Sequence, residues 1–114
     1  MIKQLTISVI AAISISGCSQ SVPPCGDSDS TELVKQIAND EMINQLGAKT
    51  AEQFEYDVIA IRTTHTNEQT GAHECAAELD ISSTITGKSE SIPIEYTVEA
   101  TDDGEHIYVN VFGL

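Results

Sequence analysis

Three histidines are the side chains of this 114-residue chain that could hold a metal ion. His65 ends the first predicted strand, His73 begins the second, and His106 begins the fourth. In an up-and-down sheet the first and third connections lie at the same end, so we expect the three imidazoles near one rim, beside several carboxylates. Imidazole and carboxylate ligands together suit zinc, copper or nickel. No His-x-His or His-Glu-x-x-His spacing is present, so the alternative is exposed histidines at strand ends.

The chain shows no pattern that is typical of catalysis. It has no Gly-x-Ser-x-Gly turn to present a nucleophilic serine. The carboxylates of the second and third predicted strands alternate with apolar residues and therefore point to solvent, which disfavours a role in acid–base chemistry. We predict no catalytic residue, no enzyme activity and no cofactor, with a small-ligand, zinc or copper carrier as the alternative function.

A set of acidic residues on two neighbouring predicted strands is the candidate for protein binding. The set comprises Glu74, Glu78 and Asp80 on one strand and Glu95 and Glu99 on the next, with Tyr108 and Phe112 on the same side if the register holds. Like charges on adjacent strands repel. A basic protein that docked on this face would relieve the repulsion and would be steered to it by the charge. A face that serves only solubility is the alternative.

The beginning of the chain has the pattern of an export signal. Lys3 precedes an apolar run over residues 5–16, and the sequence Ile-Ser-Gly-Cys closes it at residues 15–18. The run is too short to span a bilayer, but it fits the central region of a secretory signal peptide. Residues 15–18 resemble the lipobox of bacterial lipoproteins. An ordinary signal peptide or a membrane anchor is the alternative.

The lipobox resemblance implies cleavage before Cys18 and attachment of lipid, palmitate included, to that cysteine. It also implies a protein that faces the periplasm, and Ser19 favours the outer membrane over the inner one. Cleavage removes Lys3, which leaves four basic residues against eighteen acidic ones and a net charge of −14. This charge excludes nucleic acid as a partner. Anionic lipid would also repel so acidic a protein, so acyl chains must hold the protein to the membrane.

Two cysteines remain once lipid occupies Cys18. Cys25 and Cys75 are an even pair in an exported, oxidising setting, which predicts a disulfide. A thiol redox site is the alternative, but the chain has no Cys-x-x-Cys spacing. Cys75 falls on the inward phase of the second predicted strand and Cys25 precedes the predicted helix, so the bond would attach the start of the helix to the middle of the sheet.

The elements that position these residues follow from periodicity. Residues 19–30, rich in Ser, Pro, Gly and Asp, predict a tether without regular structure. A helix is predicted over residues 31–46, with Asp29 as N-cap, Glu32 completing a capping box, and Gly47 ending it. The apolar side chains of this helix drift around its axis, which is typical of a helix that lies on a sheet.

From residue 54 onward, apolar residues alternate with polar ones, which predicts four strands. The strands cover residues 54–65, 73–85, 92–99 and 107–112, joined by short turns. The apolar phase of the first strand changes after Val58, where Ile59 and Ile61 take over, so we expect a bulge there. Pro93 has no N–H to donate and favours an edge or strand-end position.

The sequence therefore predicts an α+β fold: one N-terminal helix packed on a four-stranded antiparallel β-meander with one disulfide. We assign residues 1–17 to a signal peptide, 18–30 to a lipidated tether and 31–114 to a single domain. The element order resembles cystatin-like small α+β folds in architecture only. We expect a lipid-anchored, periplasm-facing and non-catalytic binding module, either an exclusion or inhibitor lipoprotein or an assembly component of the envelope.

Overall fold

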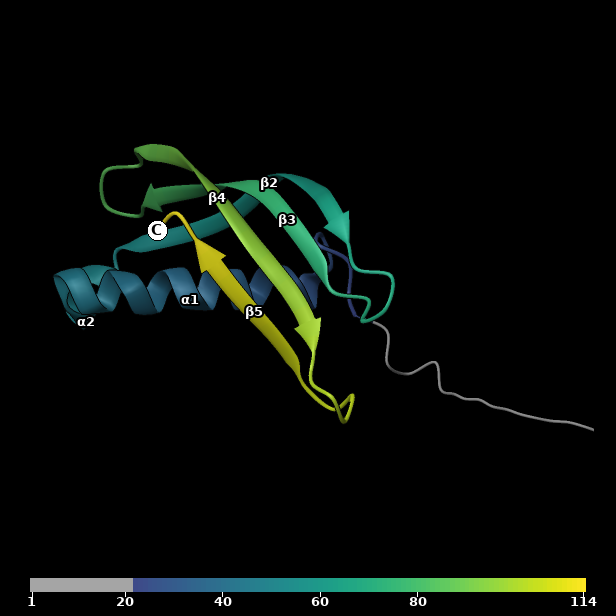
Figure 1. Cartoon of the computed structure of the whole chain (residues 1–114). Helices are drawn as coiled ribbons and strands as arrows, with labels where there is room; N and C mark the ends of the chain where they lie inside the picture. The colour runs from purple at the N-terminus through teal and green to yellow at the C-terminus, as the bar shows by residue number, and fades with distance from the viewer. Residues whose placement is uncertain (1–21) are drawn as a thin grey trace, which may run out of the picture.

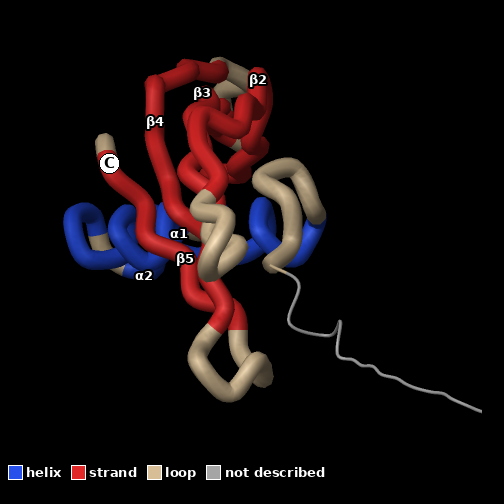
Figure 2. The backbone as a smooth tube through the Cα atoms, turned by 45° about the vertical axis from the view of Figure 1, so that its right-hand side comes forward, coloured by secondary structure: helices blue, strands red, loops and turns tan. Residues whose placement is uncertain are grey.

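A four-stranded antiparallel sheet with a helical layer on one face forms the part of the chain that is described, residues 22–114, in a computed structural model. Figure 1 shows α1 crossing beneath a strongly twisted sheet, and in the turned view of Figure 2 the strands again cross over this helix. The predicted signal peptide and the predicted lipid site, Cys18, lie outside the described residues. Within residues 22–114 no helix is long and apolar enough to cross a membrane.

Helix α1 (Ser28–Leu46) begins earlier than the sequence predicts. Its N-cap is Asp27, whose carboxylate accepts the N–H of Asp29 at 2.9 Å, so the prediction of Asp29 as N-cap is wrong. Asp29 lies in the first turn instead, where the helix dipole favours a negative charge. Gly47 ends the helix as predicted, at φ 90°, and the one-turn helix α2 (Ala48–Ala51) follows.

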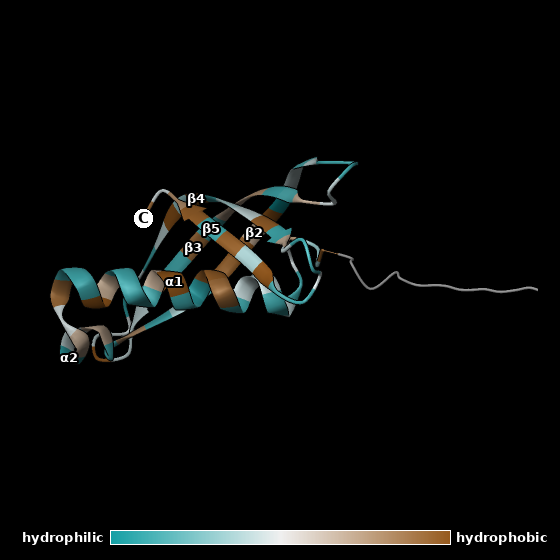
Figure 3. Cartoon of the chain, turned by 60° about the horizontal axis from the view of Figure 1, so that its bottom comes forward, coloured by the Kyte–Doolittle hydropathy of each residue, from teal (hydrophilic) through white to brown (hydrophobic). Residues whose placement is uncertain are grey.

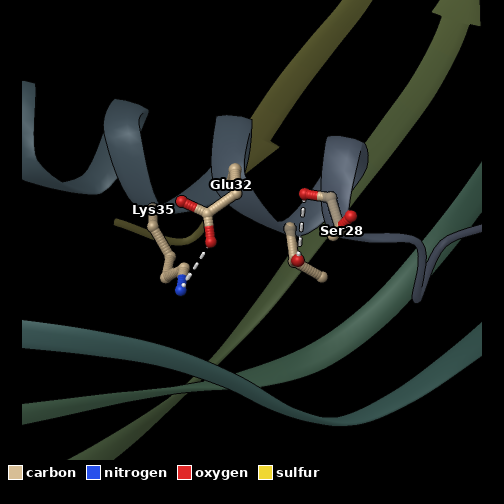
Figure 4. A network of polar contacts seen from close by, with 4 residues as sticks. Ser28, Glu32 and Lys35 are labelled. Atoms are coloured by element: carbon tan, nitrogen blue, oxygen red, sulfur yellow. Dashed lines mark hydrogen bonds and ion pairs between the residues drawn. The ribbon is translucent and has the colours of Figure 1, made fainter.

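Figure 4 shows the polar contacts of the first turns of α1. The hydroxyl of Thr31 donates to the carbonyl of Ser28 at 3.4 Å. Glu32, expected to complete a capping box, forms an ion pair with Lys35 at 2.9 Å instead. Because Glu32 is exposed, we expect this pair to contribute only a few tenths of a kcal/mol, and the helix depends on its packing against the sheet.

The last part of the predicted tether, residues 22–30, belongs to the folded domain. Val22 is only 8 % exposed, and Cys25 and Ser30 are fully buried. The hydroxyl of Ser30 donates to the carbonyl of Pro24 at 2.9 Å. Ser, Pro and Asp here form a turn that leads into α1. The prediction of a tether without regular structure is therefore wrong for residues 22–30.

The sheet consists of β2 (Phe54–Thr66), β3 (His73–Ser83), β4 (Ser89–Ala100) and β5 (Ile107–Phe112) in consecutive antiparallel order. The predicted helix and four-stranded meander are confirmed. The second strand ends earlier than predicted, because the hydroxyl of Ser83 accepts the N–H of Ile85 at 3.2 Å and begins a turn. Ile85, expected on the inward side of this strand, is 69 % exposed in that turn.

The predicted irregularity of the first strand is present in β2. Its register against β3 shifts between Ile59 and Arg62 and again between Thr63 and His65. Ala60, at φ 54°, adopts the left-handed conformation that non-glycine residues rarely take. Ile61 packs against the core, but Ile59 is 38 % exposed, so only one of the two isoleucines follows the predicted change of phase.

Pro93 lies in β4, an inner strand of the sheet. At this residue β4 pairs with β3 but not with β5. The N–H of Ser83 donates to the carbonyl of Lys88, so even-numbered residues of β4 bond to β3 and odd-numbered ones face β5. The β4–β5 ladder ends at the pair Glu95–Phe112. The N–H that Pro93 lacks would therefore point beyond the end of this ladder, so Pro93 lies where β4 is locally an edge strand, although it is not at the end of β4.

The core lies between α1 and the inner face of the sheet. Its buried side chains are Val34 and Ala38 of α1 with Val58, Cys75, Ala77, Leu79, Ile94, Tyr96 and Val98 of the strands. The predicted disulfide between Cys25 and Cys75 is confirmed, with an S–S distance of 2.06 Å and a sequence separation of 50 residues. In the chain-entropy description, closing a loop of this length stabilises the fold by about 4 kcal/mol.

A buried hydrogen bond lies beside the disulfide. The hydroxyl of Tyr96 donates to the carbonyl of Cys25 at 2.7 Å, and the Tyr96 side chain is 1 % exposed. Burial raises the pKa of Tyr96 above its ordinary value, so the hydroxyl keeps its proton and remains a donor. This bond joins the segment before α1 to β4, whereas the disulfide joins it to β3.

Replacing Tyr96 by phenylalanine tests this connection. Tyr96→Phe leaves the buried carbonyl of Cys25 without this donor, so we expect the free energy of unfolding to fall by about 1–3 kcal/mol. Tyr56→Phe is the matched control, because the hydroxyl of Tyr56 lies 3.5 Å from Asn39, a long and weak contact, and its loss should cost about 0.5 kcal/mol or less. Urea unfolding followed by circular dichroism measures both. Equal losses in the two variants would contradict the assigned role of Tyr96.

Candidate functional site

The face of the sheet that points away from α1 carries the acidic residues predicted to bind protein. The register places Glu95 opposite Ala76 of β3 and Phe112 of β5, and Glu99 opposite Tyr108. Residues directly opposite in a sheet share a face. All five acidic residues and both aromatic residues of the predicted set therefore lie on this face, with Tyr108 61 % and Phe112 56 % exposed.

Strand β2 adds two carboxylates that the sequence analysis missed. Asp57 lies directly opposite Asp80, and Glu55 lies opposite Ser82. Their alternation with apolar residues was the available signal, but only the register shows which charges become neighbours. We call the complete set the acidic face; its members are Glu55, Asp57, Glu74, Glu78, Asp80, Glu95 and Glu99.

Basic residues scarcely balance this charge. Lys35 and Lys49 belong to the helical layer and Lys88 to the β3–β4 turn, which leaves Arg62, opposite Ala76, on the acidic face. Residues 22–114 contain one ion pair, between Lys35 and Glu32. None of the seven carboxylates of the acidic face therefore forms an ion pair with another described residue.

A shallow pocket lies in the acidic face beside Phe112. It has a volume of about 290 Å³, and Arg62, Ala76, Pro93, Glu95, Phe112 and Gly113 are among the residues that line it. Gly113 has φ 103°, and a Cβ at this position would lie 2.9 Å from the carbonyl oxygen of Pro93. Glycine therefore permits the close approach that holds the end of the chain against β4. A cation placed here could contact the Glu95 carboxylate and the Phe112 ring together.

The three histidines do not share one face of the sheet. His65 is opposite Glu74, whereas His73 is opposite Thr66 and Val98, and adjacent residues of a strand point to opposite faces. His65 and His73 therefore lie on different faces of the sheet, and Nδ1 of His73 is 2.9 Å from the hydroxyl of Thr66. The part of the chain that the structure describes contains no group of three or more His, Cys, Asp or Glu residues that could hold a metal ion. The predicted site at His65, His73 and His106 thus has no ligand cluster.

The carboxylates expected near His106 include one that shapes a turn. Asp103 accepts the hydroxyl of Thr101 at 2.6 Å and the N–H of Glu105 at 3.0 Å. The hydrogen bond from Thr101 and then that from Glu105 hold the pKa of Asp103 below its ordinary value. These contacts stabilise the connection between β4 and β5, and they occupy the carboxylate that a metal ion would need.

Comparison with known proteins assigns the chain to no group. No family model matches its sequence, no curated protein matches it, and no solved structure matches its fold. The acidic face and the physical chemistry of its residues are therefore the basis for considering function.

Proposed function

We propose that the chain is a lipid-anchored, periplasm-facing module of the bacterial envelope whose acidic face binds a basic protein without catalysing a reaction. The observation that carries this proposal is the acidic face itself: one side of a sheet holds seven carboxylates that form no ion pair with another described residue, one arginine and two exposed aromatic side chains. An exclusion or inhibitor lipoprotein, or an assembly component of the envelope, would use such a face.

Electrostatic repulsion within the acidic face supports binding over solubility alone. Asp57 and Asp80 are directly opposite, and like charges in this arrangement destabilise a sheet. Glu78 and Glu95 are diagonal neighbours across β3 and β4, close enough for their long side chains to interact. A basic partner would offset this repulsion on docking, and the field of the face would raise the rate of encounter.

The aromatic residues give the acidic face a means of holding a partner. Tyr108 is paired with Glu99 and Phe112 with Glu95, so each exposed ring lies beside a carboxylate. A lysine or arginine side chain could contact a ring face and a carboxylate together, which combines cation–π attraction with charge pairing. Exposed tyrosine and phenylalanine also supply the apolar area that dominates the centre of protein interfaces.

The proposed anchor would keep the domain near its membrane. Four peptide units separate Cys18 from Val22, which packs against the domain, so the fully extended connection spans at most about 14 Å. A Cβ on Gly71, in the β2–β3 turn, would be 3.4 Å from the side chain of Val22, so the anchor joins the domain beside this turn. A partner must therefore be reachable close to the membrane surface.

The anchor is tested by replacing the lipid acceptor. Cys18→Ser removes the thiol that would carry the acyl chains, whose burial contributes about 0.8 kcal/mol per methylene. We expect loss of labelling by radioactive palmitate and a shift of the protein from the membrane fraction to the soluble fraction. Ser19→Asp is the control, which should keep the label while moving the protein toward the inner membrane. Labelling of the Cys18→Ser variant would contradict lipidation at this cysteine.

Charge reversal tests the acidic face. We expect Glu78→Lys combined with Glu95→Lys to reduce salt-sensitive capture of a basic protein from envelope extract at least tenfold, because it creates two positive charges at the centre of the face. Asp40→Lys with Glu52→Lys changes the net charge equally on the helical layer. Circular dichroism verifies folding of both variants. If both variants lost capture to the same degree, net charge and not this face would be responsible.

The repulsion itself is measurable in the free protein. Asp57→Asn removes one of two opposed charges, so we expect the free energy of unfolding in urea to rise by about 0.2–1 kcal/mol at low salt. Glu55→Gln is the matched control, because Glu55 is opposite Ser82 and no carboxylate. The difference between the variants should shrink in 1 M salt, where charges are screened. An unchanged or lower stability of Asp57→Asn would show that the opposed pair costs nothing.

A further inference from the structure

Strand β5 is an edge strand without the features that usually protect one. Its sequence, Ile-Tyr-Val-Asn-Val-Phe, contains no charged residue, proline or glycine, and its register against β4 is uninterrupted. Figure 1 shows no strand beyond it, and Figure 3 colours most of its length as hydrophobic. The other edge strand, β2, carries several charges, two register shifts and a left-handed residue. Such features block the addition of a further strand.

The free hydrogen-bonding groups of β5 can be assigned from the register. The N–H of Thr101 donates to the carbonyl of His106 at 2.9 Å, so this pair bonds across the β4–β5 ladder. Bonding alternates along an antiparallel strand, so Tyr108, Asn110 and Phe112 bond to β4. The N–H and C=O groups of the intervening residues Ile107, Val109 and Val111 therefore point away from the sheet. Their side chains are half-buried on the inner face.

Charge identifies the kind of strand that would fit. Residues 89–114, which include β4, β5 and the turn between them, contain six acidic residues and no lysine or arginine. A second copy of this chain added along β5 would place two such segments side by side, which like-charge repulsion opposes. A strand that carries basic residues on its outer side would instead approach Glu95 and Glu99 and the rings of Phe112 and Tyr108.

We propose that β5 receives an antiparallel strand of a basic partner protein, in which lysine or arginine alternates with apolar residues. This inference rests on the proposed function for the charge of the partner, and it adds the mode of recognition. The basic side chains of the added strand lie on the acidic face, and its apolar side chains continue the row of Ile107, Val109 and Val111 on the inner face. Main-chain hydrogen bonds then provide affinity while the alternation provides specificity.

An octapeptide of alternating lysine and valine, with blocked ends, is the probe, and the intact chain in detergent is the target. We expect amide hydrogen exchange, followed by NMR, to slow at least tenfold at Ile107, Val109 and Val111 when the peptide binds. Tyr108, Asn110 and Phe112 already bond to β4 and should change little. A peptide of alternating glutamate and valine should not bind.

Methylation of the peptide backbone separates strand addition from charge attraction. Directly opposite residues share a face, so the valines of the added strand present their N–H groups to β5 and the lysines present theirs to solvent. N-methylation at the valines should weaken binding at least tenfold, whereas N-methylation at the lysines should leave it nearly unchanged. Val109→Pro in the protein, which removes an outward N–H, should weaken binding similarly, and the methylated peptides give the answer if this variant is unstable.

The outcomes distinguish this inference from the proposed function. Equal binding of the two methylated peptides would overturn strand addition. Capture of a basic protein by the acidic face is tested separately, by the variant with Glu78→Lys and Glu95→Lys. Absence of binding by the lysine–valine peptide would also overturn strand addition. Protection of Ile107, Val109 and Val111 that rises with protein concentration, without peptide, would show pairing between copies and overturn the choice of a basic partner.

Discussion

The covalent and hydrogen-bonded attachment of Cys25 to the sheet is the constraint on which the rest of the structure depends. The disulfide joins Cys25 to β3, and Tyr96 of β4 donates to its carbonyl, so the start of α1 is held against two inner strands. This attachment decides which face of the sheet the helix covers. The covered face can then be apolar, and the charges of a very acidic chain must go to the opposite face or to the outside of the helix. The attachment of Cys25 thus holds the helix on the apolar face and leaves the acidic face open to solvent.

The same attachment explains how a domain of this size tolerates so much repulsion. Small domains have a net stability of about 5–15 kcal/mol, and closing the Cys25–Cys75 loop contributes about 4 kcal/mol of it. Opposed or diagonal like charges cost a few tenths to about 1 kcal/mol per pair, so the stabilisation from one disulfide is comparable to the cost of several pairs. The stabilisation by the disulfide thus offsets the cost of an unfavourable surface, and natural proteins show such unfavourable surfaces at functional sites.

Side-chain alternation within a strand is a local property, so the sequence predicted the faces of β3, β4 and β5 and with them most of the acidic face. The pairing between strands is not local. Asp57 becomes the neighbour of Asp80 only through the register of β2, and the shifts near Ile59 and Thr63 help determine the face on which His65 lies. The burial of Val22 and Ser30 has the same origin, because composition reports local flexibility whereas the disulfide attaches these residues to the core. Asp27 and Asp29 are equally good caps by residue type, and the turn that contains Cys25 selects the former.

The position of the proposed anchor relative to β5 restricts how a partner can approach. Val22 lies beside the β2–β3 turn, and a cleft lined by Thr70 and Asp102 brings this turn next to the turn between β4 and β5. Strand β5 therefore begins at the end of the domain where Val22 lies, which would carry the proposed anchor, and runs away from it. The acidic turn, with Asp103 and Glu105, would be repelled by anionic lipid and would keep the edge of β5 clear of the headgroups. An antiparallel strand added to β5 would then run toward the membrane, which favours a partner that is held in the same membrane or passes through it.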